Sequence, residues 1–109
     1  GNGAQTRSFC YVDDLLEGIL KLMHSDVHQP INLGSDRETS INDFALIINQ
    51  LAQNPAGISY HEFDGLGDDP RRRQPDISKA RTLLGWEPKI SLEEGLRRTI
   101  AHLRERVLA

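Results

Sequence analysis

Apolar and polar residues follow two different patterns along this chain. In the longer segments apolar residues recur at spacings of three and four, which places them on one side of a helix. These segments are residues 12–23, 41–52, 77–84 and 92–107. The pattern therefore predicts four amphipathic helices, each with one apolar face.

Three shorter runs are rich in β-branched and aromatic residues, which favour strands. They cover residues 7–12, 30–34 and 58–63. Each run is too short to make a stable sheet alone. The order strand, helix, strand, helix, strand, loop, helix, helix predicts a mixed α/β fold.

Residues with capping chemistry mark the ends of the later helices. Ser40, Asp76 and Ser91 each stand just before a helix, where a side-chain oxygen can accept from a free backbone N–H. Gly85 follows the third helix, where a left-handed residue closes the last turn. We expect Trp86 to fold back on that turn.

Three acidic residues open the first helix. Asp14 and Glu17 have the spacing of a capping box, and Asp13 adds negative charge at the positive end of the helix dipole. A structural role therefore explains these residues, and a catalytic carboxylate pair is not expected among them.

Composition indicates one soluble globular domain. The chain has 109 residues, of which 38% are hydrophobic and 27% charged, so it can bury one modest core. No apolar run approaches the roughly 20 residues that cross a bilayer, and the polar start, residues 1–5, does not have the form of a signal peptide. A cytoplasmic location is expected, and the single cysteine, Cys10, cannot form an internal disulfide.

Three consecutive arginines stand in a proline-bounded loop, residues 68–76, which we call the arginine loop. Proline on either side makes a helix interior impossible there, and guanidinium groups bind phosphate or carboxylate oxygens two bonds at a time. The loop therefore favours a small anionic ligand. The alternative is a solvated loop whose arginines only pair with Asp68, Asp69 and Asp76.

Charge and histidine spacing argue against two other classes of ligand. The net charge of −3 gives no basic field for nucleic acid. His24 and His28 are four residues apart, but no third ligand is evident, so no metal site is expected.

Four motifs follow one another along the chain. They are Gln-Thr-Arg-Ser-Phe-Cys-Tyr-Val-Asp-Asp-Leu-Leu-Glu-Gly in residues 5–18, Pro-Ile-Asn-Leu-Gly in 30–34, Asp-Asp-Pro-Arg-Arg-Arg-Gln-Pro-Asp-Ile-Ser-Lys-Ala in 68–80, and Leu-Gly-Trp-Glu-Pro in 84–88. Together they resemble one family, the extended short-chain dehydrogenases/reductases that act on nucleotide sugars. The chain is similar to the C-terminal part of such enzymes. The arginine loop is most similar to that of UDP-glucuronate decarboxylases, whereas dTDP-glucose 4,6-dehydratases and UDP-sugar epimerases share the other motifs.

The resemblance implies an α/β fold that is the substrate-binding portion of an extended Rossmann-type enzyme. Residues 9–35 would pack on an N-terminal Rossmann half, and residues 36–109 would form the substrate-binding subdomain. That half would hold NAD through a glycine-rich turn after a strand, a motif that this chain lacks. It also lacks Tyr-x-x-x-Lys, because Leu15 and Asp64 stand four residues after its two tyrosines. The chain alone is therefore expected to be inactive.

The resemblance also implies roles for five residues. Arg7 matches an arginine that contacts the substrate diphosphate, and Gln5 is its neighbour in the same strand. Arg73 matches an arginine near the sugar carboxylate and diphosphate, where a permanently charged group would act by electrostatics. Arg71 and Arg72 are weaker candidates.

In the parent enzyme the implied reaction is oxidation of the sugar at C4 by NAD, loss of CO2 and return of the hydride. The implied partners are a UDP-sugar and the Rossmann half, with neither nucleic acid nor membrane. Without that half, apolar faces of residues 12–23 and 31–33 would lose their cover. We therefore expect a homodimer or other self-association.

Overall fold

The computed structural model describes residues 1–61 and 71–108. It confirms a small α/β fold in which all four predicted helices form, the third of them as a short π-helix. The elements in chain order are β1 (Thr6–Arg7), α1 (Val12–Met23), β2 (Thr39–Ser40), α2 (Ile41–Leu51), η1 (Ala80–Leu84) and α3 (Leu92–Leu108).

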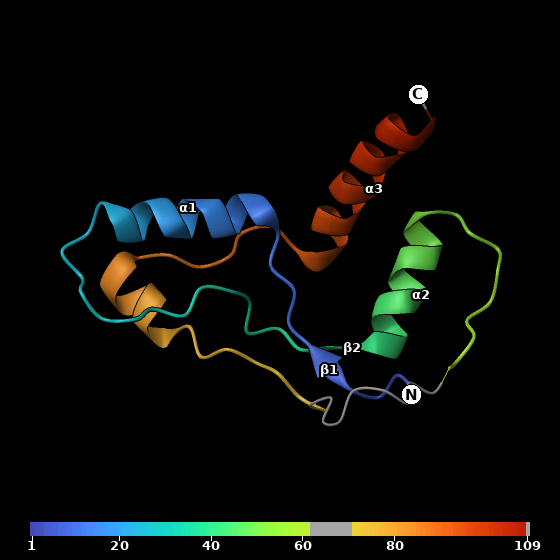
Figure 1. Ribbon diagram of the computed structural model, residues 1–109, viewed down its shortest axis with the longest axis horizontal. Coiled ribbons are helices and arrows are strands. Elements are labelled where there is room, and N and C mark those ends of the chain that lie inside the picture. Colours follow the sequence, from blue (N-terminus) through green and yellow to red (C-terminus); the bar gives the residue numbers. More distant parts are fainter. Residues whose placement is uncertain (62–70, 109) are drawn as a thin grey trace.

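Two pairs of helices lie on either side of a short sheet. Figure 1 shows α1 beside η1 and α2 beside α3, with β1 and β2 between the two pairs. β1 and β2 are antiparallel, with Thr6 opposite Ser40 and Arg7 opposite Thr39. None of the helices within the described ranges has both the length and the apolar character required to cross a membrane.

Three of the predicted caps are present, at Ser40, Ser91 and Gly85, whereas the N-cap of η1 is Lys79 and not Asp76. Ser40 Oγ accepts from the backbone N–H of Asp43 at 3.0 Å, and Ser91 Oγ accepts from that of Glu94 at 3.1 Å. Gly85 closes η1 with a φ of 61°, a conformation that glycine adopts without steric cost. Local sequence therefore sets where these helices begin and end.

The core lies between α1 and η1. Its fully buried apolar residues are Ile77, Ala80 and Trp86. As predicted, Trp86 folds back on η1. Its side chain is buried with Ala80, and its backbone N–H donates to the carbonyl of Ala80 at 3.1 Å. Its indole Nε1 donates to the carbonyl of Asp14 at 2.9 Å, so this side chain joins α1 to the C-terminal part of the chain.

The predicted capping box of α1 is wrong. The N-cap residue is Tyr11, and its side chain makes no capping hydrogen bond. Asp14 is only 4% exposed, and its Oδ2 accepts from the backbone N–H groups of Lys89 at 3.1 Å and Ile90 at 2.8 Å. Glu17 forms ion pairs with Lys21 and Lys89. These acids hold α1 against the segment before α3.

The predicted strands are mostly wrong. Of residues 7–12 only Arg7 is in a strand, residues 30–34 pair with no strand among the described residues, and β2 was not predicted. Residues 58–61 are not a strand, and 62–63 lie outside the described residues. The physical reason at 30–34 is that Ile31 and Leu33 pack against the core without a strand beside them.

One face of α1 is open to solvent, as the resemblance implied. Leu16 is 51% exposed, Leu20 54% and Met23 70%. The expectation for residues 31–33 is wrong in part, because Ile31 and Leu33 are half-buried against Trp86 and its neighbours. The exposed apolar surface is therefore on α1 and not on the segment that follows it.

Candidate functional site

The three consecutive arginines run beside β1. The backbone N–H of Thr6 donates to the carbonyl of Arg71 at 2.7 Å, and Thr6 forms a parallel β-bridge with Arg72. Ser8 Oγ donates to the carbonyl of Arg73 at 3.4 Å, a contact across 65 positions of sequence. Since β2 pairs with the other edge of β1, β1 lies between β2 and the arginine loop.

The side chains on one face of this arrangement meet at a single carboxylate. Glu38 Oε1 accepts from Thr6 Oγ1 at 3.2 Å and from Arg72 Nε at 2.5 Å. Arg72 Nη2 also donates to Gln74 Oε1 at 2.6 Å. Arg72 is thus held by two acceptors within the chain, which makes it the least available of the three arginines for a ligand.

The other candidate arginines belong to the opposite face. Successive side chains of extended backbone alternate in direction, so we infer that Arg7, Arg71 and Arg73 project away from Glu38. Arg7 Nη1 donates to the carbonyl of Thr6 at 2.7 Å. Within residues 1–61 and 71–108, the side chains of Arg71 and Arg73 have no hydrogen-bond or ion-pair partner, and both are exposed.

Gln5 lies one residue before β1. Its carbonyl accepts from the backbone N–H of Ile41 at 2.9 Å, and its side chain is half-buried. The first residues of the arginine loop, 68–70, lie outside the described residues. Asp76, which could have paired with an arginine, accepts instead from the backbone N–H and the hydroxyl of Ser78. Those hydrogen bonds lower the pKa of the Asp76 carboxyl.

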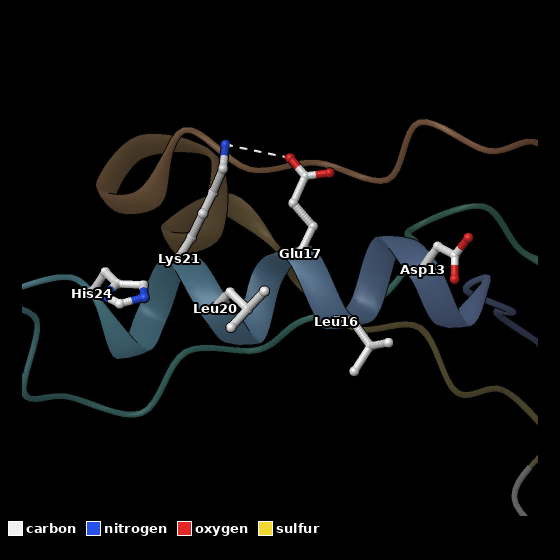
Figure 2. A pocket seen from close by; sticks show the side chains of 6 residues that line it. All are labelled: Asp13, Leu16, Glu17, Leu20, Lys21 and His24. Carbon is white, nitrogen blue, oxygen red and sulfur yellow. Dashed lines mark ion pairs between the residues drawn. The ribbon is translucent and has the colours of Figure 1, made fainter.

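Two hollows in the described surface lie away from these arginines. One, of about 490 Å³, lies on the open face of α1, where Leu16 and Leu20 are flanked by polar residues. Figure 2 shows Glu17 and Lys21 along its upper edge, joined by their ion pair. This hollow is largely apolar and has no geometry suited to a diphosphate.

A second hollow, of about 240 Å³, lies between the residues before β2 and those before α3. Its arginines are already paired, Arg81 with Asp36 at 3.0 Å and Arg37 with Glu93 at 2.8 Å. No group of three histidine, cysteine or acidic side chains suited to a metal ion exists in the part of the chain that the structure describes. The arginines beside β1 therefore remain the best candidate for an anion site.

Two residues that sequence reasoning missed organise this site, Glu38 and Gln74. Neither lies in a recognisable local pattern, since Glu38 stands in a polar stretch and Gln74 stands within the arginine loop. The available signal was indirect: Glu38 is an acid outside the predicted helices and so a candidate partner for an arginine of the loop.

Comparisons with known proteins concern the family and the fold of this chain. A family described as GDP-mannose 4,6 dehydratase matches residues 1–99. Among similar sequences, UDP-glucuronic acid decarboxylase 1 of Xenopus tropicalis is 50% identical over 105 residues, which is 96% of this chain and 24% of that protein. The chain thus spans about a quarter of the length of this curated relative.

Solved structures with the same fold include two epimerases. UDP-glucose 4-epimerase of Thermotoga maritima, solved with UDP-glucose, has a TM-score of 0.90 and 32% identity over 98% of this chain and 34% of its own. UDP-glucuronic acid 4-epimerase of Bacillus cereus, solved with UDP-glucuronic acid and NAD, has a TM-score of 0.85 and 28% identity over 97% of this chain and 34% of its own.

Proposed function

Because the chain belongs to the family described as GDP-mannose 4,6 dehydratase, we propose that it is the UDP-sugar-binding segment of an NAD-dependent UDP-glucuronate decarboxylase that forms UDP-xylose. The observation that carries this proposal is the placement of residues 71–73 beside β1, which puts Arg73 on a segment next to the strand that contains Arg7. The 50% identity to a UDP-glucuronic acid decarboxylase supports the choice of reaction.

Arg7 and Arg73 are the proposed contacts to the substrate. Arg7, with Gln5 beside it, would bind the diphosphate, and Arg73 would lie near the sugar carboxylate and the diphosphate. A guanidinium group stays charged, so Arg73 would stabilise negative charge that develops on the sugar rather than transfer a proton. Arg71 is a secondary candidate. Arg72 ranks below it because Glu38 and Gln74 already hold its guanidinium.

The residues of this chain do not fit NAD. No glycine-rich strand-to-helix turn is present, and neither Tyr11 nor Tyr60 is followed four positions later by lysine. We therefore assign the cofactor and the proton chemistry to another part of the parent protein. The open face of α1, with Leu16 and Leu20 exposed, supports the proposal that residues 9–35 pack on that part.

Kinetics of the parent protein test the two arginines. Arg7→Ala should weaken UDP binding by about 10- to 100-fold, since a hydrogen bond to a charged group contributes about 1.5 to 3 kcal/mol. Arg73→Ala should lower kcat for UDP-glucuronate more than it weakens UDP binding. Arg97→Ala is the matched control, because it removes an exposed arginine whose one partner among the described residues is Glu94 on α3. Unchanged UDP affinity in the first variant, or intact decarboxylation in the second, would contradict the assignment.

A 4-epimerase is the second candidate, favoured by the two solved epimerases of the same fold. A 4,6-dehydratase acting on dTDP-glucose is a further alternative within the family. The product separates them. UDP-glucuronate would give UDP-xylose and CO2 with a decarboxylase, but a UDP-sugar of unchanged mass with an epimerase.

A further inference from the structure

One carboxylate joins the arginine loop to β1. Glu38 Oε1 accepts from Arg72 Nε at 2.5 Å and from Thr6 Oγ1 at 3.2 Å. Thr6 belongs to β1, and Arg72 is the residue bridged to it in parallel. The same oxygen therefore holds these two residues in register.

Gln74 adds a second connection between the same segments. Its Oε1 accepts from Arg72 Nη2 at 2.6 Å, and its Nε2 donates to the carbonyl of Asp36 at 2.6 Å. A single exposed ion pair contributes little to stability. Here, however, the members of the network share acceptors, which restricts each of them more than one isolated pair would. The Glu38 side chain is the less exposed of the two, at 29% against 68% for the Arg72 side chain.

We propose that Glu38 is a positioning residue of the anion site, which acts through Arg72 to keep Arg73 beside Arg7. The inference rests on the proposed function, because it explains how that function's two arginines come to share one face. It divides the three consecutive arginines into two roles. Arg72 holds the loop, whereas Arg73, and secondarily Arg71, faces the ligand. Without Glu38, both ligand arginines remain in the sequence but the loop can leave β1.

A double-mutant cycle in the full-length parent protein tests this division. Glu38→Ala and Arg72→Ala should each weaken UDP binding by a similar factor of about 5 to 10, and the double variant should be no weaker than either single one, because both remove the same connection. If Arg72 contacts UDP itself, Arg72→Ala alone will weaken binding, and Glu38→Ala will leave it unchanged or strengthen it by removing a nearby negative charge. That outcome would overturn the proposal.

Amide hydrogen exchange gives a second readout that needs no ligand. The Thr6 N–H donates across to the arginine loop, so its exchange in the unliganded protein should be about tenfold faster or more in both single variants, since exchange reports local opening. Glu38→Gln keeps an acceptor oxygen and should restore most of the protection. Unchanged exchange at Thr6 in Glu38→Ala would overturn the positioning role.

The controls separate failure of this inference from failure of the proposed function. Arg97→Ala should leave both the Thr6 exchange and the UDP affinity unchanged. If the wild-type protein binds no UDP, the proposed function fails, and the positioning role fails with it whatever the exchange shows. If the wild type binds UDP but the losses of UDP affinity in the two single variants add up in the double variant, only the positioning role fails.

Discussion

Gly18 lies where α1 packs on Trp86, and it leaves no room for a side chain. A Cβ there would be 3.0 Å from Trp86 Cε2 and 3.1 Å from Leu33 Cδ2. Trp86 is 1% exposed and tied to Asp14 through its Nε1, so the ring cannot retreat. Gly18→Ala should therefore destabilise the chain by about 1 to 3 kcal/mol through overpacking, although alanine is the better helix former.

Gly95 in α3 provides the control for Gly18. A Cβ there would be 3.1 Å from Tyr11 Cδ1, but Tyr11 is only half-buried and can move aside. Gly95→Ala should therefore be close to neutral. Both variants are compared by urea denaturation at one protein concentration, and equal effects at the two positions would contradict the role assigned to Trp86.

The structural role of a single residue could be predicted where its hydrogen-bond partner is close in sequence. Ser40 and Ser91 cap helices because their oxygens meet an N–H three residues later. Asp14 has the same local appearance, but its partners are 75 and 76 residues away. Spacing carries no information about such a contact, which exists only once the chain has folded.

At the scale of elements, the Asp14 carboxylate holds α1 to the segment that leads into α3. Asp14→Ala would leave the backbone N–H groups of Lys89 and Ile90 without their acceptor. The expected loss is about 2 to 3 kcal/mol, as for hydrogen bonds to a charged group. Asp13→Ala is the matched control, because Asp13 is an exposed acid of the same helix turn and should cost less than about 1 kcal/mol. Urea denaturation measures the loss of stability in each variant. Equal losses would mean that Asp14 stabilises the chain only through the helix dipole.

A second pair of elements is joined by an ion pair that responds to pH. The hydrogen bond from Arg37, which precedes β2, to Glu93 in α3 holds the pKa of the Glu93 carboxyl at about 2, below its ordinary value of 4.5. The unfolded chain therefore takes up this proton first as the pH falls. The contribution to stability is present above pH 4.5 and is lost as the pH approaches 2.

Comparison of the wild type with Glu93→Gln tests the direction of this pH dependence. The difference in thermal midpoint should be constant above pH 4.5 and shrink towards zero near pH 2. It should be small throughout, since both side chains are about half exposed, Arg37 at 51% and Glu93 at 42%. A difference that grew on acidification would contradict the lowered pKa.

Helices could be predicted and strands could not, for one physical reason. A helix satisfies its hydrogen bonds internally, whereas a strand exists only where another strand lies beside it. Residues 30–34 have a strand-like composition but no partner in the described structure, while Thr39–Ser40 became β2 because it meets β1. The pairing between the arginine loop and β1 was equally invisible in the local pattern, and only the resemblance to nucleotide-sugar enzymes linked Arg7 with Arg73.

The whole molecule is more open than a complete domain of this length. Its radius of gyration is 16.6 Å, against about 13 Å expected for a compact domain of that size. The fully buried apolar core in the described residues is limited to Ile77, Ala80 and Trp86. Such a chain leaves apolar surface that a stable fold normally covers. Among the described residues, the largest group of exposed apolar side chains lies on α1: Val12, Leu16, Ile19, Leu20 and Met23.

The open face of α1 should make the isolated chain self-associate. Exposed apolar patches drive association, so sedimentation at micromolar concentration should give dimers or larger species. Leu16→Lys combined with Leu20→Lys should shift the chain towards monomer, because both leucines are more than half exposed on that face. Leu103→Lys on α3, where the leucine is equally exposed at 52%, should change nothing. In the parent protein the same double variant should instead lower stability, since we propose that other residues cover α1 there. A wild-type chain that sediments as a compact monomer, or a parent protein that tolerates both lysines without loss, would show that this face needs no cover.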